Sequence, residues 1–345
     1  MDWSALPPEL LHLISTKFSS FSDLIHFRAV CNTWRASATS VLPTQIPYFL
    51  LEPDPGDTTL QFYSLTSCKA HTVTVPSCHD QTVLDLSNGF LLVQHLENPD
   101  LSLLNPVTNS KVSLPFLQIK RPQLVWSSPD PTRTDGYTVC LFGNARLPNK
   151  LSAFWRCGEL EWSTINNGSP RSCYYGEMHL VLSTVSKNLD IFDVATKTLR
   201  DVVPPPPGEG PFSPRGALVY IVASAGHVLR VLEHDDRCQP VDQCHFDIHR
   251  LEFGADKKKP SWVKVSNIGD QVLFLNIVNG FSISASCFEG VRGNSIYFMK
   301  AEGILFDHHS CYNLARYDIG TGIAEELPFP SVTGGAWFLP SLHYF

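Results

Sequence analysis

Two hydrophobic patterns divide the chain. In residues 6–35, "LPPELLHLISTKFSSFSDLIHFRAVCNTWR", apolar side chains recur every three or four positions, which predicts short helices. Beyond them, short apolar or alternating runs are bounded by Gly, Pro, Asn and Asp, which predicts strands. We therefore expect a small all-α head of three helices over residues 1–42 and an all-β domain over residues 43–345.

The β-rich part repeats one unit. Three stretches share the order of a β run, a polar break, a second run, a tight turn and a third run; they are residues 89–115, 178–204 and 294–328. Their turns begin at Asn105, Asp193 and Asp318 and share the pattern Asx-x-x-Thr. Asx side chains bind their own backbone two residues on, which favours such turns. The outer hairpins that we expect lie near residues 64, 105, 157, 193, 254 and 318.

Two more apolar runs lie between successive hairpins, which gives four strands per unit; in the last unit these runs are residues 272–277 and 294–300. Four-stranded units in series are the blades of a β-propeller. The first unit has three local strand candidates, and the run near residues 336–339 is expected to supply its fourth strand and protect an open sheet edge. We expect six four-stranded blades; seven is the alternative.

Composition and charge narrow the functional classes. Charged residues make up 17% of the chain and hydrophobic residues 43%, which indicates a packed globular protein. The net charge of -7 argues against a nucleic-acid surface. Residues 1–20 lack the pattern of a signal peptide, and the longest apolar run, residues 217–226, is about half a membrane span. We expect a protein that is not secreted, does not enter membranes, and acts in the cytoplasm and/or nucleus, with its ten cysteines reduced and buried.

Catalytic motifs are missing from the sequence. No G-x-S-x-G, G-x-x-x-x-G-K-[ST] or H-E-x-x-H pattern occurs, so we expect neither catalysis nor a cofactor. The best metal candidates are Cys238, Cys244, His245 and His249. If the last two lie on one strand, about 13 Å separates them, too far for one zinc ion with bonds of about 2.0–2.3 Å. No metal site is expected.

Binding needs no such residues, because a propeller carries variable loops on rigid blades. The longest predicted loops are residues 204–216, 233–243 and 300–311. The aromatic side chains that could contact a partner are Trp126, Trp155, Trp162, Tyr174, Tyr175 and Trp262. Packing between blades is their more common role.

A head of about 40 residues rarely buries enough surface to be stable alone. Either it packs on its own β domain, or it docks on the helices of another protein. The head carries one ordered set of positions: Leu6, Pro7, Leu10, Leu11, Ile14, Leu24, Phe27, Arg28, Val30, Cys31, Trp34 and Arg35. In these residues it resembles an F-box, which implies that they bind the Skp adaptor of cullin-based ubiquitin ligases. For Leu11, Ile14, Phe27 and Trp34, packing of the three helices is an equal alternative.

The stretches "SNGFLLV", "QVLFLNIVNGFSISASCFEGVRGNSIYFM" and "YDIGTGIAEELPFP" resemble the C-terminal domain of a plant F-box family, some of whose members are described as kelch-like or Skp-interacting. Together the two resemblances imply a non-catalytic substrate-recognition subunit of an SCF-type E3 ubiquitin ligase, which links the Skp adaptor and its cullin to an unknown target protein. Two alternatives stay open: a non-degradative F-box scaffold, and a propeller hydrolase or sugar-binding protein.

Overall fold

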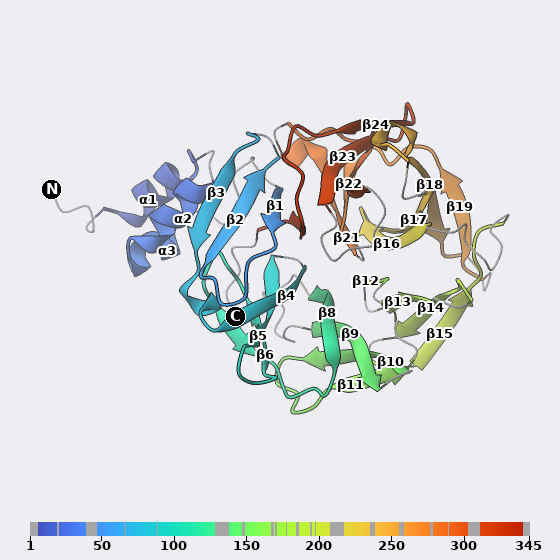
Figure 1. Ribbon diagram of the computed structural model, residues 1–345, viewed down its shortest axis with the longest axis horizontal. Helices are drawn as coiled ribbons and strands as arrows, with labels where there is room; N and C mark the ends of the chain where they lie inside the picture. The colour runs from blue at the N-terminus through green and yellow to red at the C-terminus, as the bar shows by residue number, and fades with distance from the viewer. Residues whose placement is uncertain are drawn as a thin grey trace. The chain divides into compact units, whose positions relative to one another are not determined.

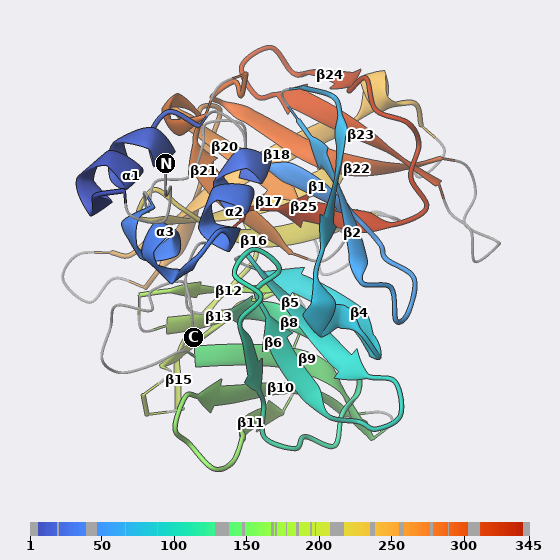
Figure 2. The same ribbon diagram turned by 90° about the vertical axis from the view of Figure 1, so that its left-hand side faces the viewer.

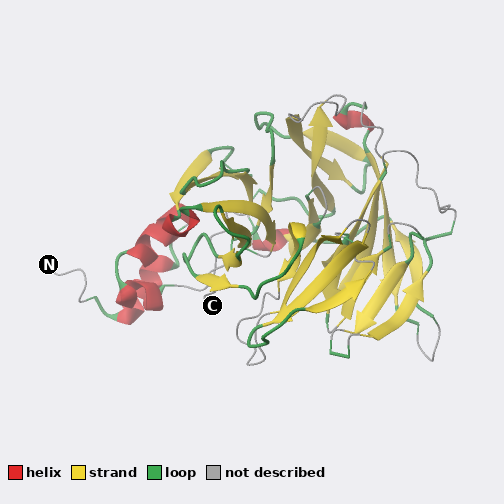
Figure 3. Ribbon diagram, turned by 60° about the horizontal axis from the view of Figure 1, so that its bottom comes forward, coloured by secondary structure: helices red, strands yellow, loops and turns green. Residues whose placement is uncertain are grey.

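The computed structural model shows helices at the N-terminal end of the chain and strands over most of the rest (Figure 3). The described residues are 6–18, 21–38, 47–65, 67–87, 89–127, 138–146, 149–166, 169, 171–176, 178–183, 186–193, 195–196, 198–207, 217–234, 239–254, 259–276, 279–288, 290–302 and 311–340. By its internal contacts the chain divides into two compact units, residues 1–114 with 286–291 and 337–345, and residues 115–285 with 292–336.

The head consists of three short helices, as the helical spacing predicts, and Figure 2 shows them grouped together. They are α1 (Pro8–Ser15), α2 (Phe21–Ala29) and α3 (Asn32–Ser37). Pro7 and Pro8 begin α1, where a missing backbone N–H leaves no bond unmade. The amides of Leu10 and Leu11 each donate to the Pro7 carbonyl at 3.1 Å.

The β-rich part is a six-bladed β-propeller whose described strands form six sheets (Figure 1). In hydrogen-bonding order, blade 1 contains β25 (Gly335–Phe338), β1 (Tyr48–Leu51), β2 (Thr59–Ser64) and β3 (Ala70–Thr74). Blade 2 contains β4 (Gln81–Ser87), β5 (Phe90–His95), β6 (Leu101–Leu104) and β7 (Lys111–Ser113). Blade 3 contains β8 (Lys120–Ser127), β9 (Thr138–Arg146), β10 (Asn149–Arg156) and β11 (Ser163–Asn166).

Blades 4 to 6 continue the series. Blade 4 contains β12 (Ser172–Tyr175), β13 (Met178–Leu182), β14 (Leu189–Asp193) and β15 (Thr198–Val203). Blade 5 contains β16 (Leu218–Ser224), β17 (His227–His234), β18 (His245–Glu252) and β19 (Ser261–Val265). Blade 6 contains β21 (Gly280–Ser284), β20 (Gln271–Leu275), β22 (Ser295–Glu302), β23 (Cys311–Asp318) and β24 (Ile323–Glu326). Three-residue 3-10 helices occur at Pro76–Cys78, Val241–Gln243 and Ala285–Cys287.

The sequence pattern of each strand matches its place in a blade. Central strands such as β6 and β20 are buried along nearly their whole length, which matches their continuous apolar runs in the sequence. The last strands β3 and β7 alternate between exposed and half-buried residues, as expected where one face meets solvent.

Stacking of whole sheets forms the core of residues 115–336. One cluster joins blades 4 and 5 and includes Leu180, Ile191, Val219 and Trp262. A second cluster joins blades 5 and 6, where the Phe246 and Phe298 rings meet edge to face with centroids 5.0 Å apart. Blade 5 is therefore covered by apolar side chains on both faces.

All six predicted outer hairpins are confirmed, each joining the last two strands of a blade. The predicted Asx turns are also confirmed. Asn105 Oδ1 accepts hydrogen bonds from the amides of Val107 at 2.9 Å and Thr108 at 3.2 Å. Asp193 Oδ1 accepts from the Thr196 amide at 2.8 Å, and Asp318 Oδ1 accepts from the amides of Gly320 and Thr321, both at 3.0 Å.

Blade 6 departs from the expected four strands. The two predicted runs form neighbouring strands β20 and β22, but these are parallel, with Val272 opposite Ser295. Parallel neighbours need a connecting segment, and here β21 provides part of it by folding back on β20 as a fifth strand. Gly280 permits this tight return, because a Cβ there would lie 2.8 Å from the Phe274 carbonyl oxygen.

Blade 1 is built from distant parts of the sequence, since β25 lies beside β1 in the sheet. Trp337 in β25 is fully buried, and its ring meets Phe49 of β1 edge to face with centroids 5.3 Å apart. Phe338 lies in the same interior, 5.3 Å from the Phe62 ring of β2. Aromatic packing thus attaches the C-terminal strand.

We predict that Trp337→Ala lowers the free energy of unfolding by about 3–5 kcal/mol, because it removes a buried indole and leaves a cavity against Phe49. Urea unfolding followed by tryptophan fluorescence measures this change. Phe116→Ala is the control, because Phe116 is exposed and should change the midpoint little. Equal midpoints for both variants would contradict the packing role of Trp337.

We also predict a pH-dependent contribution from the Asp318 turn. Hydrogen bonds from the backbone of Thr321 and Gly320 lower the pKa of Asp318 below its usual 3.8. A carboxyl whose pKa is lowered by folding stabilises the native state above its unfolded pKa, and that contribution disappears as the pH falls through the folded pKa. Asp318→Asn should therefore melt below wild type at pH 7, and the gap should shrink as the pH falls below about 4.

Melting curves from pH 7 to pH 3 test this prediction. Asp100→Asn is the matched control, because Asp100 is exposed and its side chain makes no hydrogen bond among the described residues. A gap for Asp318→Asn that stays constant or widens on acidification would refute the role assigned to the turn.

Candidate functional site

A small interior holds the three head helices together. Leu11, Leu24 and Phe27 are buried in it. The Phe27 ring lies 5.3 Å from Phe18 and 4.5 Å from Trp34, measured between ring centroids. For Leu11 and Phe27 the packing role is therefore the one that the structure assigns.

Other apolar side chains of the head face outward. Leu10, Leu13 and Ile14 lie on one side of α1, because residues three and four positions apart share a helix face. These three and Val30, which follows α2, are between 39% and 57% exposed. We call Leu10, Leu13, Ile14 and Val30 the apolar head face.

The twelve predicted binding residues thus fall into three groups. Those that are exposed are Pro7, Leu10, Ile14, Val30 and Arg35; those that are half-buried are Leu6, Arg28, Cys31 and Trp34; those that are buried are Leu11, Leu24 and Phe27. Leu13 was not among the candidates, although its position three residues after Leu10 could have indicated it. The Arg35 Nε donates to the Arg28 carbonyl at 3.2 Å, so Arg35 links α3 to the end of α2.

The predicted metal candidates do not converge. Residues 245–252 form strand β18, so His245 and His249 are separated along a strand as expected. Cys244 is buried in the core between blades 5 and 6, and Cys238 lies outside the described residues. The His245 Nδ1 lies 3.2 Å from the Tyr317 hydroxyl. Among the described residues, no group of three or more His, Cys, Asp or Glu side chains could hold a metal ion.

A buried Cys–His pair lies between blades 3 and 4. Cys140 Sγ is 3.8 Å from His179 Nε2, and both side chains are fully buried. Burial lowers the pKa of His179 to about 3 and raises the pKa of Cys140 well above its usual value. The thiol and the imidazole therefore both stay neutral near pH 7, the opposite of a cysteine activated as a nucleophile. Packing is the role of this pair.

The described cysteines are free thiols, but not all are buried as expected. Cys78, Cys140, Cys173 and Cys244 are buried; the exposed ones are Cys68, Cys157 and Cys287, and the half-buried ones are Cys31 and Cys311. The exposed thiols occur in turns and in a short 3-10 helix, where no sheet covers them. The expectation of general burial was therefore wrong.

The predicted binding loops lie largely outside the described residues, which exclude 208–216, 235–238 and 303–310. The side chains of Trp126 and Tyr174 are also outside the described part. Trp155 donates its indole N–H to the Glu159 carbonyl at 2.9 Å, which fixes the local turn after β10. Trp162 donates its indole N–H to the Pro115 carbonyl, also at 2.9 Å, which ties the start of β11 to the segment that precedes β8. Trp262 packs between blades 4 and 5.

Among the described residues, no helix has the length and apolar character needed to cross a membrane.

Two family models match the chain. Residues 3–45 match the F-box domain, which covers the head, and residues 62–321 match the KIB1-4 beta-propeller. Relatives in Arabidopsis thaliana match over most of their length. The F-box/kelch-repeat protein At1g57790 is 23% identical over 90% of this chain and 84% of its own, and the F-box protein At2g05970 is 24% identical over 98% and 96%. The chain belongs to the KIB1-4 beta-propeller family and carries an F-box domain at its head.

Proposed function

We propose that this chain is the substrate-recognition subunit of an SCF-type ubiquitin ligase. The head binds the Skp adaptor and, through it, the cullin, while the propeller holds a target protein for ubiquitination. The chain makes and breaks no covalent bond. Its contribution is proximity, because tethering raises the effective concentration of target lysines near the activated ubiquitin. The proposal places this activity in the cytoplasm, the nucleus or both.

The observation that supports the proposal most is the apolar head face. Its side chains lie on a segment that matches the F-box domain and remain 39–57% exposed, although covering the remaining apolar area would be favourable. An amphipathic helix with such a face suits an apolar groove between partner helices. Pro7, Leu10, Leu13, Ile14 and Val30 are the direct contacts in this proposal.

The buried candidates act differently in the same proposal. Leu11, Leu24 and Phe27 hold the helices in the arrangement that presents the apolar head face. Leu6, Arg28, Cys31, Trp34 and Arg35 lie at or near the surface and complete the contact.

We predict that Leu10→Asp combined with Ile14→Asp weakens capture of the Skp adaptor by at least about a hundredfold, because two carboxylates would enter an apolar contact without partners. The melting temperature should stay close to that of wild type, since both positions are exposed in the free chain. Titration of purified adaptor against each chain measures the affinity.

Two control variants separate contact from folding. Leu160→Asp alters the propeller at a side chain that is 93% exposed and should leave adaptor capture unchanged. Leu11→Ala should weaken capture only together with a loss of helix signal, because it removes a buried leucine at a cost of about 2–5 kcal/mol. Full adaptor affinity in the double aspartate variant would exclude the apolar head face as the contact.

A further prediction distinguishes a ligase receptor from a scaffold. Proximity labelling with the wild-type chain and with the Leu10→Asp/Ile14→Asp chain should recover the same partners of the propeller, because the substitutions lie only in the head. Quantitative mass spectrometry should show fewer ubiquitinated lysines on those partners with the variant. Unchanged ubiquitination of every shared partner would favour the scaffold.

A further inference from the structure

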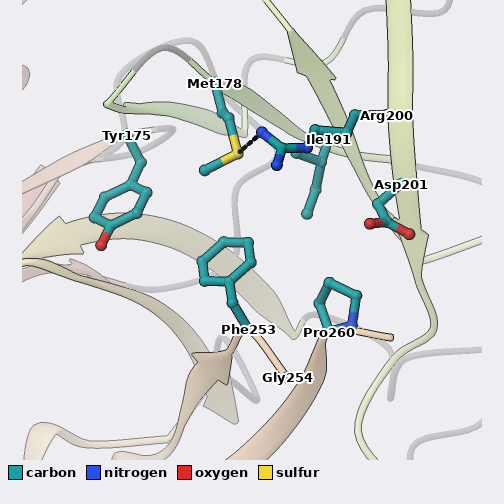
Figure 4. Close-up of a pocket in the computed structure, with 8 residues that line it drawn as sticks. All are labelled: Tyr175, Met178, Ile191, Arg200, Asp201, Phe253, Gly254 and Pro260. Atoms are coloured by element: carbon teal, nitrogen blue, oxygen red, sulfur yellow. Dashed lines mark hydrogen bonds between the residues drawn. The ribbon is translucent and has the colours of Figure 1, made fainter. Parts of the chain in front are cut away.

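A pocket of about 320 Å³ lies between blades 4 and 5 (Figure 4). Its walls come from both blades and include Tyr175, Met178, Arg200, Asp201 and Phe253. Pockets for small ligands range over about 300–1,000 Å³. This one is at the lower end, the size for one or two side chains of a bound peptide.

One wall of the pocket is aromatic. The rings of Tyr175 and Phe253 are nearly parallel, at 7°, with centroids 6.1 Å apart. The Tyr175 hydroxyl donates to the Gly226 carbonyl in the β16–β17 turn, which connects the two blades and fixes the ring. Phe253 is 44% exposed, so its ring is open to a ligand. A rigid apolar wall of this kind suits an inserted apolar side chain.

The opposite wall carries two charged residues that are adjacent in the sequence, Arg200 and Asp201. In a regular strand, neighbouring side chains point to opposite faces of the sheet. A bulge in β15 prevents this. Asp201 pairs with Ile191 and Leu199 pairs with Phe192, so Arg200 is the extra residue between them. A bulge redirects side chains locally. Arg200 and Asp201 consequently line the same pocket.

The Arg200 guanidinium has few hydrogen-bond partners among the described residues. Its Nη1 lies 3.7 Å from the Met178 sulfur, a weak acceptor, as the dashed line in Figure 4 marks. Among the described residues, Arg200 makes no other hydrogen bond or ion pair, although its charge interacts electrostatically with the carboxylate of Asp193. A guanidinium in this state suits a carboxylate from a partner.

Strand β15 itself offers a surface for a partner. It is the last strand of blade 4, so one of its backbone edges is not used in that sheet. Its Leu199 and Val202 are 52% and 39% exposed. Proteins usually protect such edges, and an extended peptide can add to an open one as a further strand.

We propose that this pocket binds an extended segment of the target protein that pairs with β15. An apolar side chain of the segment enters the pocket against Tyr175 and Phe253. An acidic residue beside it faces Arg200, and a basic residue faces Asp201. The inference rests on the proposed function, in that it names where and how the propeller holds its target.

The test is a selection of displayed random peptides of about ten residues, roughly one strand with its flanks, against the purified full chain without adaptor. Peptides enriched by wild type should carry an apolar residue with acidic and basic neighbours. Arg200→Glu should lower their affinity at least about tenfold, since one charge-assisted bond is lost and a like charge is added. A fresh selection against Arg200→Glu should enrich apolar residues with basic neighbours instead. N-methylation of the peptide amides should also lower affinity at least about tenfold if the segment pairs with β15.

The control is Lys111→Glu, which changes an exposed cation on β7, the last strand of blade 2, and should enrich the same peptides as wild type. Failure to enrich peptides, or identical sets from wild type and from an Arg200→Glu chain with unchanged melting, would overturn the inference. Adaptor capture is measured on the same chains. If the wild-type chain does not bind the adaptor, the ligase proposal is contradicted, whatever peptides the pocket binds. If the chain binds the adaptor normally but peptide binding does not depend on Arg200, only the proposal for this pocket is contradicted.

Discussion

Three short helices can enclose only a few side chains, and this limit governs the head. Leu11, Leu24 and Phe27 fill the available interior, so Leu10, Leu13 and Ile14 must remain outside on the other side of α1. Small domains bury a low fraction of their surface for geometric reasons. The same helix that stabilises the head from within therefore carries the apolar surface that suits a partner.

The propeller buries a larger share of its apolar side chains, because its sheets stack on one another. Blade 5 has apolar cover on both faces. Between blades 3 and 4, burial lowers the pKa of His179 and raises that of Cys140, so both groups stay neutral near pH 7. Such a body changes little when its edges vary. Partner recognition then depends on edge strands and turns. In β15, the one extra residue of the bulge places Arg200 and Asp201 on the same wall of the pocket.

Local signals in the sequence predicted most of the fold. Asx-x-x-Thr turns, Pro at a helix start and runs of buried residues act over a few positions, so the hairpins and the head helices could be placed. The fifth strand of blade 6 was not predicted, although Asn279-Gly280 is a common hairpin signal. It follows from the parallel pairing of β20 with β22, a contact between segments that are not adjacent in the sequence. Which head residues are buried, where the β15 bulge falls, and which cysteines are exposed depend on three-dimensional packing that periodicity does not encode.

The pairing of β25 with β1 has a consequence for synthesis on the ribosome. Residue 335 is made 284 residues after residue 51 (335 − 51), and translation proceeds at about 5–20 residues per second. For about 14–57 seconds the nascent chain has a β1 edge without its neighbour, a state open to mispairing. The three head helices are made well before β25, so a chaperone or an early-binding partner has time to bind them while β1 still lacks its neighbour.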